Sequence, residues 1–164
     1  ELLFLGGLSS DRAPGREMVR QVLDSGRAAE QFALMVSEQG GPAALLEQPE
    51  RYLPVAPIVR PVFPSASGYV SAIDTRAVGM AVIALGGGRQ RVEDSIDPAV
   101  GISRITGIGG RVDSSVPLAI VHASSEDGWR HAEQLLRNAY TLSVDPTEDR
   151  PVIHAQIEGN TIDG

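Results

Sequence analysis

The sequence predicts an α+β fold, with a helical N-terminal segment followed by a β-rich part with flanking helices. Within the first 50 residues, apolar side chains recur at helical spacing, as between Met18 and Leu23. From Pro54 onward, prolines alternate with β-branched residues, which is typical of strands at the edge of a sheet. The 164 residues include 18 glycines and 11 prolines, which indicates many turns and short elements. We therefore expect two domains, residues 1–53 and residues 54–164.

The helical segment, residues 1–53, starts with an apolar run that stops at Gly6 and Gly7, as the end of a helix would. The chain lacks an initial Met, and we expect it to be cut from a longer protein. A helix is predicted over 17–24, and a second helix is predicted to follow Ser25 and Gly26 and to stop at Gly40 and Gly41. We expect the helical residues to form an antiparallel hairpin. A short helix is predicted from Pro42 to Leu46, because proline suits the first turn of a helix.

The second part, residues 54–164, begins with a proline-rich linker that passes into edge strands. A strand is predicted over 68–73, and either Asp74 or Thr75 is expected to cap the helix that follows it. Another helix is predicted to open at Ser124 or Ser125. Its predicted buried stripe consists of Trp129, Ala132, Leu135, Leu136 and Ala139. Further strands are predicted over 100–105, 116–122, 141–144 and 152–157.

The composition excludes several classes of function. The chain has no cysteine, which excludes disulfides and thiolate metal sites and favours a reducing cytoplasm. Its net charge of −7 argues against nucleic-acid binding through a general basic field. All 14 basic residues are arginine, so Schiff-base chemistry and biotinyl or lipoyl attachment are excluded. Apolar stretches are too short to cross a bilayer, and we expect neither a membrane segment nor a signal peptide.

A glycine-rich stretch at Gly86–Gly88 with the neighbouring Arg89 invites comparison with a phosphate-binding loop. Phosphate loops place their free amides at the start of a helix, where the helix dipole also attracts an anion. Here the glycines follow a predicted helix, so we interpret them as the stop of that helix.

Glu93, Asp94 and Asp97 form an acidic cluster, but their spacing does not match a calcium loop. We interpret the cluster as a solvated loop in which Asp97 caps the turn at Pro98. Arg89 is expected to pair with Asp94 or Asp97 and to hold this loop.

The histidines are His122, His131 and His154, and they lie far apart in the sequence. A metal site would need two or three of them together with a carboxylate. Nothing in their spacing requires this, and we interpret them as structural residues. The sequence also lacks a recognisable nucleophile elbow. We therefore predict no catalytic residue, no cofactor-binding residue, no metal ligand and no cofactor for this chain.

Four stretches of the chain resemble one family. They are VLDSGRAAEQFALMVSEQGGP (22–42), GYVSAIDTRAVGMAVIALGGGR (68–89), DSIDPAVGI (94–102) and GGRVDSSVPLAIVHA (109–123). Together they resemble the pyrimidine nucleoside phosphorylases. The second stretch is most similar to the bacterial thymidine phosphorylase branch, whose C-terminal part this chain resembles.

The resemblance implies a fold and a reaction. Residues 1–53 would belong to the larger α/β domain, and residues 54–164 would form a β-rich barrel-sandwich or hammerhead lobe. The strand pair around Gly68–Val70 and Gly110–Val112 is the part of the sequence that suggests this lobe. The family, a group of pentosyltransferases, catalyses reversible phosphorolysis of thymidine to thymine and 2-deoxyribose 1-phosphate.

The family's phosphate-binding and base-binding residues belong to its N-terminal half, and none of them maps onto this sequence. The resemblance therefore implies a non-catalytic scaffold that works with the parent enzyme's N-terminal domains. Those domains would bind phosphate and the pyrimidine nucleoside. A cytoplasmic homodimer, or another homo-oligomer, is expected. The alternatives are the lobe of a broader pyrimidine nucleoside or nucleotide phosphorylase, or a stand-alone binding or interaction module.

Overall fold

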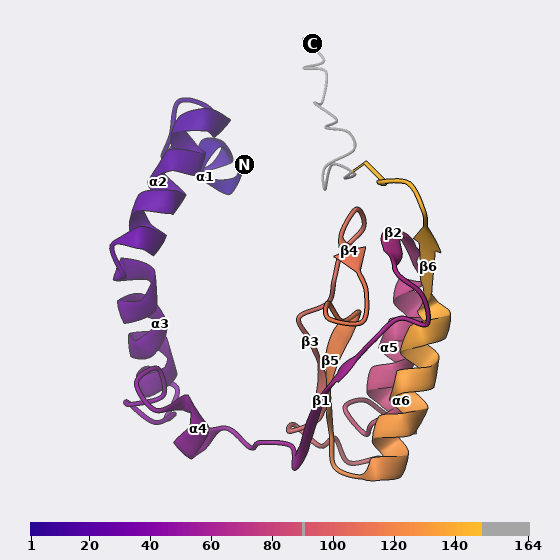
Figure 1. Cartoon of the computed structure of the whole chain (residues 1–164). Helices are drawn as coiled ribbons and strands as arrows, with labels where there is room; N and C mark the ends of the chain where they lie inside the picture. The colour runs from indigo at the N-terminus through magenta and orange to yellow at the C-terminus, as the bar shows by residue number, and fades with distance from the viewer. Residues whose placement is uncertain (90, 149–164) are drawn as a thin grey trace, which may run out of the picture. The chain divides into compact units, whose positions relative to one another are not determined.

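The computed structural model describes residues 1–89 and 91–148, and it confirms the α+β class. The chain divides into two compact units, Glu1–Pro54 and Val55–Gly164. The first unit contains only helices and loops, and the second contains the strands (Figure 1).

The first unit is a succession of short and medium helices. They are α1 (Leu2–Leu5), α2 (Arg12–Asp24), α3 (Arg27–Glu38) and α4 (Pro49–Tyr52). Helix α2 begins five residues before the predicted start, because Asp11 caps it: its carboxylate accepts a hydrogen bond from the Arg12 amide at 2.6 Å. Gly26, at φ +80°, separates α2 from α3.

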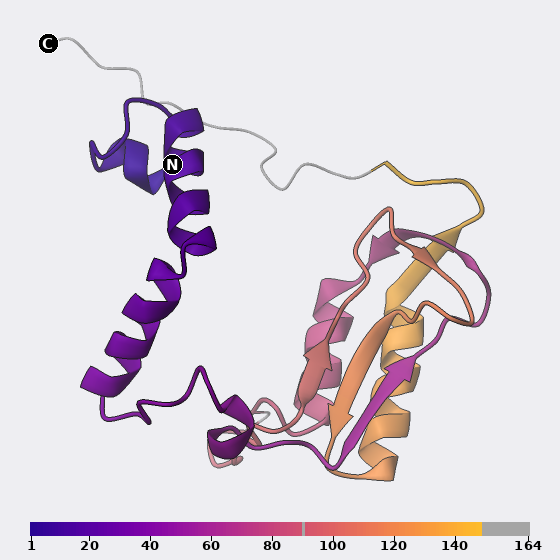
Figure 2. The same cartoon turned by 60° about the vertical axis from the view of Figure 1, so that its left-hand side comes forward.

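Two expectations for this unit were wrong. Helices α2 and α3 follow each other end to end and do not form an antiparallel hairpin (Figures 1 and 2). Ser25 keeps a right-handed helical conformation, so only Gly26 leaves the helical region and the chain bends without reversing. The helix predicted from Pro42 to Leu46 is replaced by turns, and the short helix α4 starts later, with Pro49 in its first turn.

The described part of the second unit contains two antiparallel sheets of three strands each. Sheet A has the order β1 (Ile58–Val62), β5 (Ala119–Ala123), β3 (Gly101–Ser103). Sheet B has the order β4 (Arg111–Val112), β2 (Gly68–Ile73), β6 (Tyr140–Ser143). Within the described residues neither sheet closes, so the barrel form suggested by the family resemblance is not present there.

The register agrees with two predictions from the sequence. Strand β1, which contains Pro61, lies at the edge of sheet A, where a missing amide donor can be tolerated. The expected pair around β2 and β4 is present, with Gly68 opposite Val112 and Tyr69 opposite Arg111. The strand predicted over 152–157 lies outside the described residues.

In the part of this unit that the structure describes, two helices pack beside the sheets, and both are capped as the sequence predicts. Asp74 caps α5 (Thr75–Ala84) by accepting a hydrogen bond from the Ala77 amide at 3.0 Å. Ser125 caps α6 (Glu126–Ala139) by accepting one from the Gly128 amide at 3.1 Å. Helix α6 packs on β1 and β5, and α5 lies beside α6 (Figures 1 and 2).

The core of the second unit forms between α6 and the two sheets. Its largest fully buried side chains are Leu118, Leu136, Val62, Val70, Val112 and Val121. The predicted stripe of α6 is confirmed, although Trp129 and Leu135 are only half-buried. The buried Tyr140 hydroxyl lies 3.2 Å from both the Thr106 and the Leu118 carbonyl oxygens, and burial raises its pKa.

We predict that Leu136→Ala lowers the free energy of unfolding of the second unit by about 2–5 kcal/mol, because the fully buried side chain leaves a cavity. Urea unfolding followed by Trp129 fluorescence measures the change. Val92→Ala is the control, since Val92 is 89% exposed and should shift the free energy by less than about 0.5 kcal/mol. Equal midpoints for the two variants would contradict the described core.

Candidate functional site

The glycine stretch after α5 is the stop of that helix, as the sequence predicts. Gly86 adopts a left-handed conformation, at φ +96°, and its amide donates to the Ile83 carbonyl at 2.9 Å. The Gly87 amide donates to the Val82 carbonyl at 3.0 Å. These amides satisfy the last carbonyls of the helix, so they are not available to hold a phosphate.

The acidic loop is held by backbone contacts. Asp97 donates its amide to the Gly86 carbonyl at 2.9 Å, and its carboxylate accepts from the Ala99 amide at 2.9 Å, which is the expected cap at Pro98. Asp94 accepts from the Arg91 amide at 2.8 Å. The prediction that Arg89 pairs with Asp94 or Asp97 is wrong. Arg89 is exposed and forms no ion pair in the described part of the chain.

The histidines do not come together. His122 lies on β5, whereas His131 is exposed on α6, and His154 lies outside the described residues. Among residues 1–89 and 91–148, no group of three or more His, Cys, Asp and Glu residues could hold a metal ion.

The structure brings together a pair that sequence reasoning missed. Ser103 at the end of β3 places its hydroxyl oxygen 2.8 Å from Nε2 of His122. The two residues are 19 positions apart in the sequence, so only the pairing of β3 with β5 brings them into contact. Both side chains are half-buried. The pattern Ala119, Val121, Ala123 could have signalled that His122 belongs to the opposite face of β5.

The residue after this pair has an unusual backbone. Arg104 has φ +49°, and it is the only residue other than glycine with a positive φ in the described part of the chain. Holding a residue other than glycine in this left-handed backbone conformation costs about 1–3 kcal/mol of conformational free energy. Arg104 is exposed, and no salt bridge to it is found among the described residues.

A second polar cluster joins β1 to the start of α6. The Arg60 guanidinium donates two hydrogen bonds to the Glu126 carboxylate, one of them at 3.0 Å, and lies 5.6 Å from the centre of the Trp129 ring. The hydrogen bond from Arg60 lowers the pKa of Glu126, and the attraction between the charges adds to the effect. Arg60 therefore links β1, at the edge of sheet A, to the start of α6.

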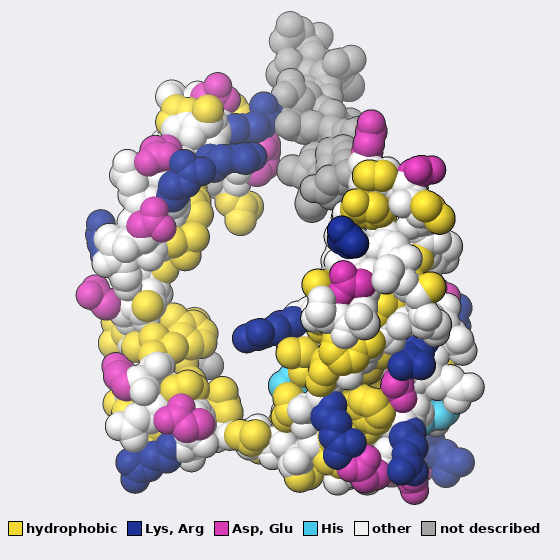
Figure 3. Space-filling model, viewed as in Figure 1, with side chains coloured by type: hydrophobic (Ala, Val, Ile, Leu, Met, Phe, Trp, Pro, Cys, Tyr) yellow, Lys and Arg dark blue, Asp and Glu magenta, His cyan; other side chains and the backbone are white. Residues whose placement is uncertain are grey.

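The first unit has an extensive apolar surface along α2 and α3. We call it the α2–α3 face, and it consists of Met18, Val19, Val22, Leu23, Phe32 and Met35, each between 40% and 62% exposed. Figure 3 shows hydrophobic side chains gathered along one side of these helices.

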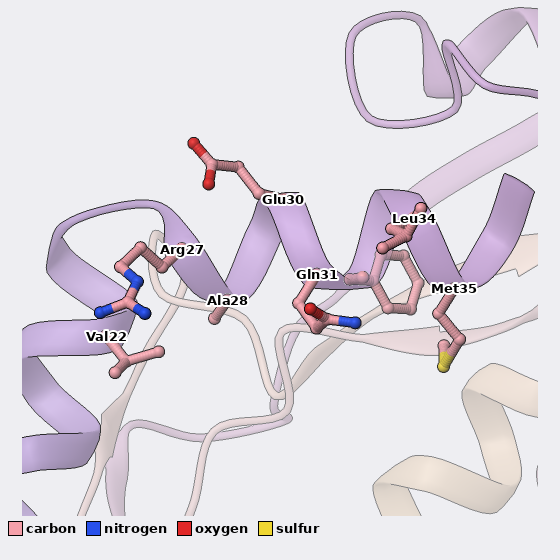
Figure 4. Close-up of a pocket in the computed structure, with 8 residues that line it drawn as sticks. Val22, Arg27, Ala28, Glu30, Gln31, Leu34 and Met35 are labelled. Atoms are coloured by element: carbon pink, nitrogen blue, oxygen red, sulfur yellow. The ribbon is translucent and has the colours of Figure 1, made fainter.

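Two adjoining hollows lie on the α2–α3 face. One, of about 810 Å³, lies along α3, and in Figure 4 Ala28, Gln31 and Met35 point to one side of the helix while Glu30 points to the other. The second, of about 300 Å³, lies against α2 and is lined only by apolar residues. Val22 and Ala28 line both. Such a large exposed apolar surface is typical of an interaction site.

Part of the chain matches a known family. Residues 69–143 match the model of the pyrimidine nucleoside phosphorylase C-terminal domain. The matched segment runs from β2 to β6 and includes both α5 and α6. The predicted resemblance to this family is confirmed over these residues, and the match does not distinguish the thymidine branch from the others. In the part of the chain that the structure describes, no helix is long and apolar enough to span a membrane.

We predict that Arg60→Gln raises the pKa of Glu126 toward its ordinary value of about 4.3. In the folded protein this pKa is lowered, so the stabilisation from the pair is present above the ordinary value and is lost as the pH falls through the lowered one. An NMR titration of the Glu126 carboxyl carbon measures the shift. Arg111→Gln is the control, because Arg111 pairs with Asp113 instead. An unchanged titration of Glu126 in Arg60→Gln would show that the pair does not form in solution.

Proposed function

We propose that this chain is the C-terminal part of a pyrimidine nucleoside phosphorylase of the thymidine phosphorylase type. The parent enzyme would be a pentosyltransferase that converts thymidine and phosphate reversibly into thymine and 2-deoxyribose 1-phosphate. The observation that supports this proposal best is the match of residues 69–143 to the C-terminal domain of that family. A broader pyrimidine nucleoside or nucleotide phosphorylase is the alternative, because the match does not specify which substrate the enzyme accepts.

The chain itself would be a scaffold without catalytic residues. Cleavage of a glycosidic bond by phosphate needs fixed cationic and hydrogen-bonding groups around both the phosphate and the departing base. The chain has no lysine, and the glycine stretch after α5 uses its amides to end a helix. The phosphate and the nucleoside would bind to the parent enzyme's N-terminal domains.

The α2–α3 face would be the surface by which the chain joins those domains. In this proposal residues 1–53 belong to the larger α/β domain, and residues 54–164 form the lobe. Burying the exposed apolar side chains of Met18, Phe32 and Met35 against that domain would remove them from water. The absence of cysteine fits a cytoplasmic enzyme, and a homodimer is the assembly that we propose.

We predict that the isolated chain does not catalyse phosphorolysis of thymidine. The assay mixes the purified chain with thymidine and phosphate and follows thymine release by absorbance. Adding the separately produced N-terminal domains of the parent enzyme should restore turnover. Turnover by the chain alone that scales with its concentration and survives repurification would overturn the scaffold proposal. A failure of the added domains to bind the chain would favour a stand-alone module.

We predict that the isolated chain self-associates through the α2–α3 face, because exposed apolar patches promote association. Phe32→Glu places a charge in the middle of this face and should shift the chain toward the monomer in light scattering. Gln39→Glu is the control, since Gln39 is exposed at the end of α3 and does not belong to the face. A chain that stays monomeric at high concentration, or equal masses for the two variants, would contradict this role.

A further inference from the structure

We propose that Ser103, Arg104 and His122 form a binding site for a phosphate group, either free phosphate or a phosphate monoester. We call these residues the β3–β5 cluster. The proposal is independent of the proposed phosphorolysis activity, because it concerns binding by this chain alone. Four observations support it: an uncovered face, a pair of hydrogen-bonding groups, strands without acidic residues and a strained arginine.

The cluster lies on the face of sheet A opposite to the core. Ala119, Val121 and Ala123 are fully buried on the core side of β5, so the alternate residue His122 belongs to the other side. Ser103 is opposite Ile120 in the register, which places it on the same side as His122. Val59, the partner of His122 in β1, is 47% exposed.

The face is also open beside His122. Gly101 of β3 is the residue opposite His122, and a Cβ atom added there would meet no atom within 4 Å. A ligand therefore has room next to the imidazole ring. Solvent reaches the cluster in the described structure, since Ser103 and His122 are half-buried and Arg104 is exposed.

The Ser103–His122 pair can offer donors to an oxyanion. When Nε2 of His122 donates to the Ser103 hydroxyl oxygen across the 2.8 Å contact, the serine proton is free to donate to a ligand. The arginine at the next position adds a planar set of N–H donors that suits phosphate oxygens. A hydroxyl and a guanidinium from adjacent residues are a donor set that suits an anion.

The strands that carry the cluster place no negative charge beside it. The chain has a net charge of −7, yet β1, β3 and β5 contain no Asp or Glu. Arg60 and Arg111 already have acidic partners, Glu126 and Asp113. Arg104 is therefore the arginine that remains to meet an anion at this cluster.

The backbone of Arg104 supports a role other than folding. Glycine would adopt φ +49° without strain, so an arginine at this position does not serve stability. Strained residues with side chains cluster at binding sites. Arg104→Gly therefore distinguishes a role in stability from a role in binding. Loss of the backbone strain should stabilise the fold, whereas loss of the guanidinium should weaken binding.

The test is a titration of the full chain with inorganic phosphate at constant ionic strength, followed by amide and imidazole NMR signals. Signals of Ser103, Arg104 and His122 should shift together along one binding curve. Arg104→Gly should keep or raise the thermal midpoint and weaken phosphate binding about tenfold or more, as expected for a lost charge-assisted hydrogen bond. Ser103→Ala should also weaken binding.

Arg89→Gly is the matched control. It removes the same charge from another exposed position without touching the β3–β5 cluster, so phosphate binding should stay within twofold. If both arginine variants weakened phosphate binding equally, the effect would come from the overall charge of the chain. That result would overturn the proposed site. Absence of shifts at the cluster, or unaltered binding by Arg104→Gly, would also overturn it.

A parallel titration with 2-deoxyribose 1-phosphate distinguishes the two sources of the phosphate group. Tighter binding of the ester assigns the site to a phosphate monoester, and equal binding assigns it to free phosphate. Both results support the cluster as a phosphate site. Phosphorolysis assays do not enter this test, so the site and the proposed activity can fail separately.

Discussion

The packing of α6 against β5 is the contact on which the rest of the second unit depends. Both elements contribute small buried side chains to the core. These are Ala119 and Ala123 on the strand, and Ala132 and Ala139 on the helix. Small residues allow a helix and a strand to approach closely, and Leu136 of α6 is fully buried in the same core. Because one face of β5 is fixed in this way, its other face must carry the remaining residues, including His122.

The two units differ in how far they bury their apolar residues. The second unit buries valines, alanines and leucines from two sheets and two helices in one core. Gly15 is the only residue of the helices in the first unit that is buried, and its α2–α3 face remains open. A helix whose apolar stripe has no partner gains little stability on its own. This contrast is what the proposed role predicts, with one unit folding by itself and the other completing a larger domain.

Local signals along the sequence determined most of the elements but missed the polar pair. The caps at Asp74 and Ser125, the edge position of Pro61 and the stop at Gly86 all depend on residues a few positions apart, so they were visible in the sequence. The contact of Ser103 with His122 depends on strand register across 19 positions, and no local pattern encodes it. The expected ion pair of Arg89 was also not visible locally, and the Asp97 carboxylate instead accepts a hydrogen bond from the Ala99 amide.

The sequence by itself determined the α+β class, the exclusion of thiol and lysine chemistry, and the family resemblance over the C-terminal residues. These follow from composition, from periodicity and from motifs that are continuous in the chain. Only the tertiary structure decided that α2 and α3 run end to end, that two separate sheets form, and that Ser103, Arg104 and His122 share one region. Those features depend on a single backbone angle at Gly26 and on pairings between distant strands, which no local stretch of sequence specifies.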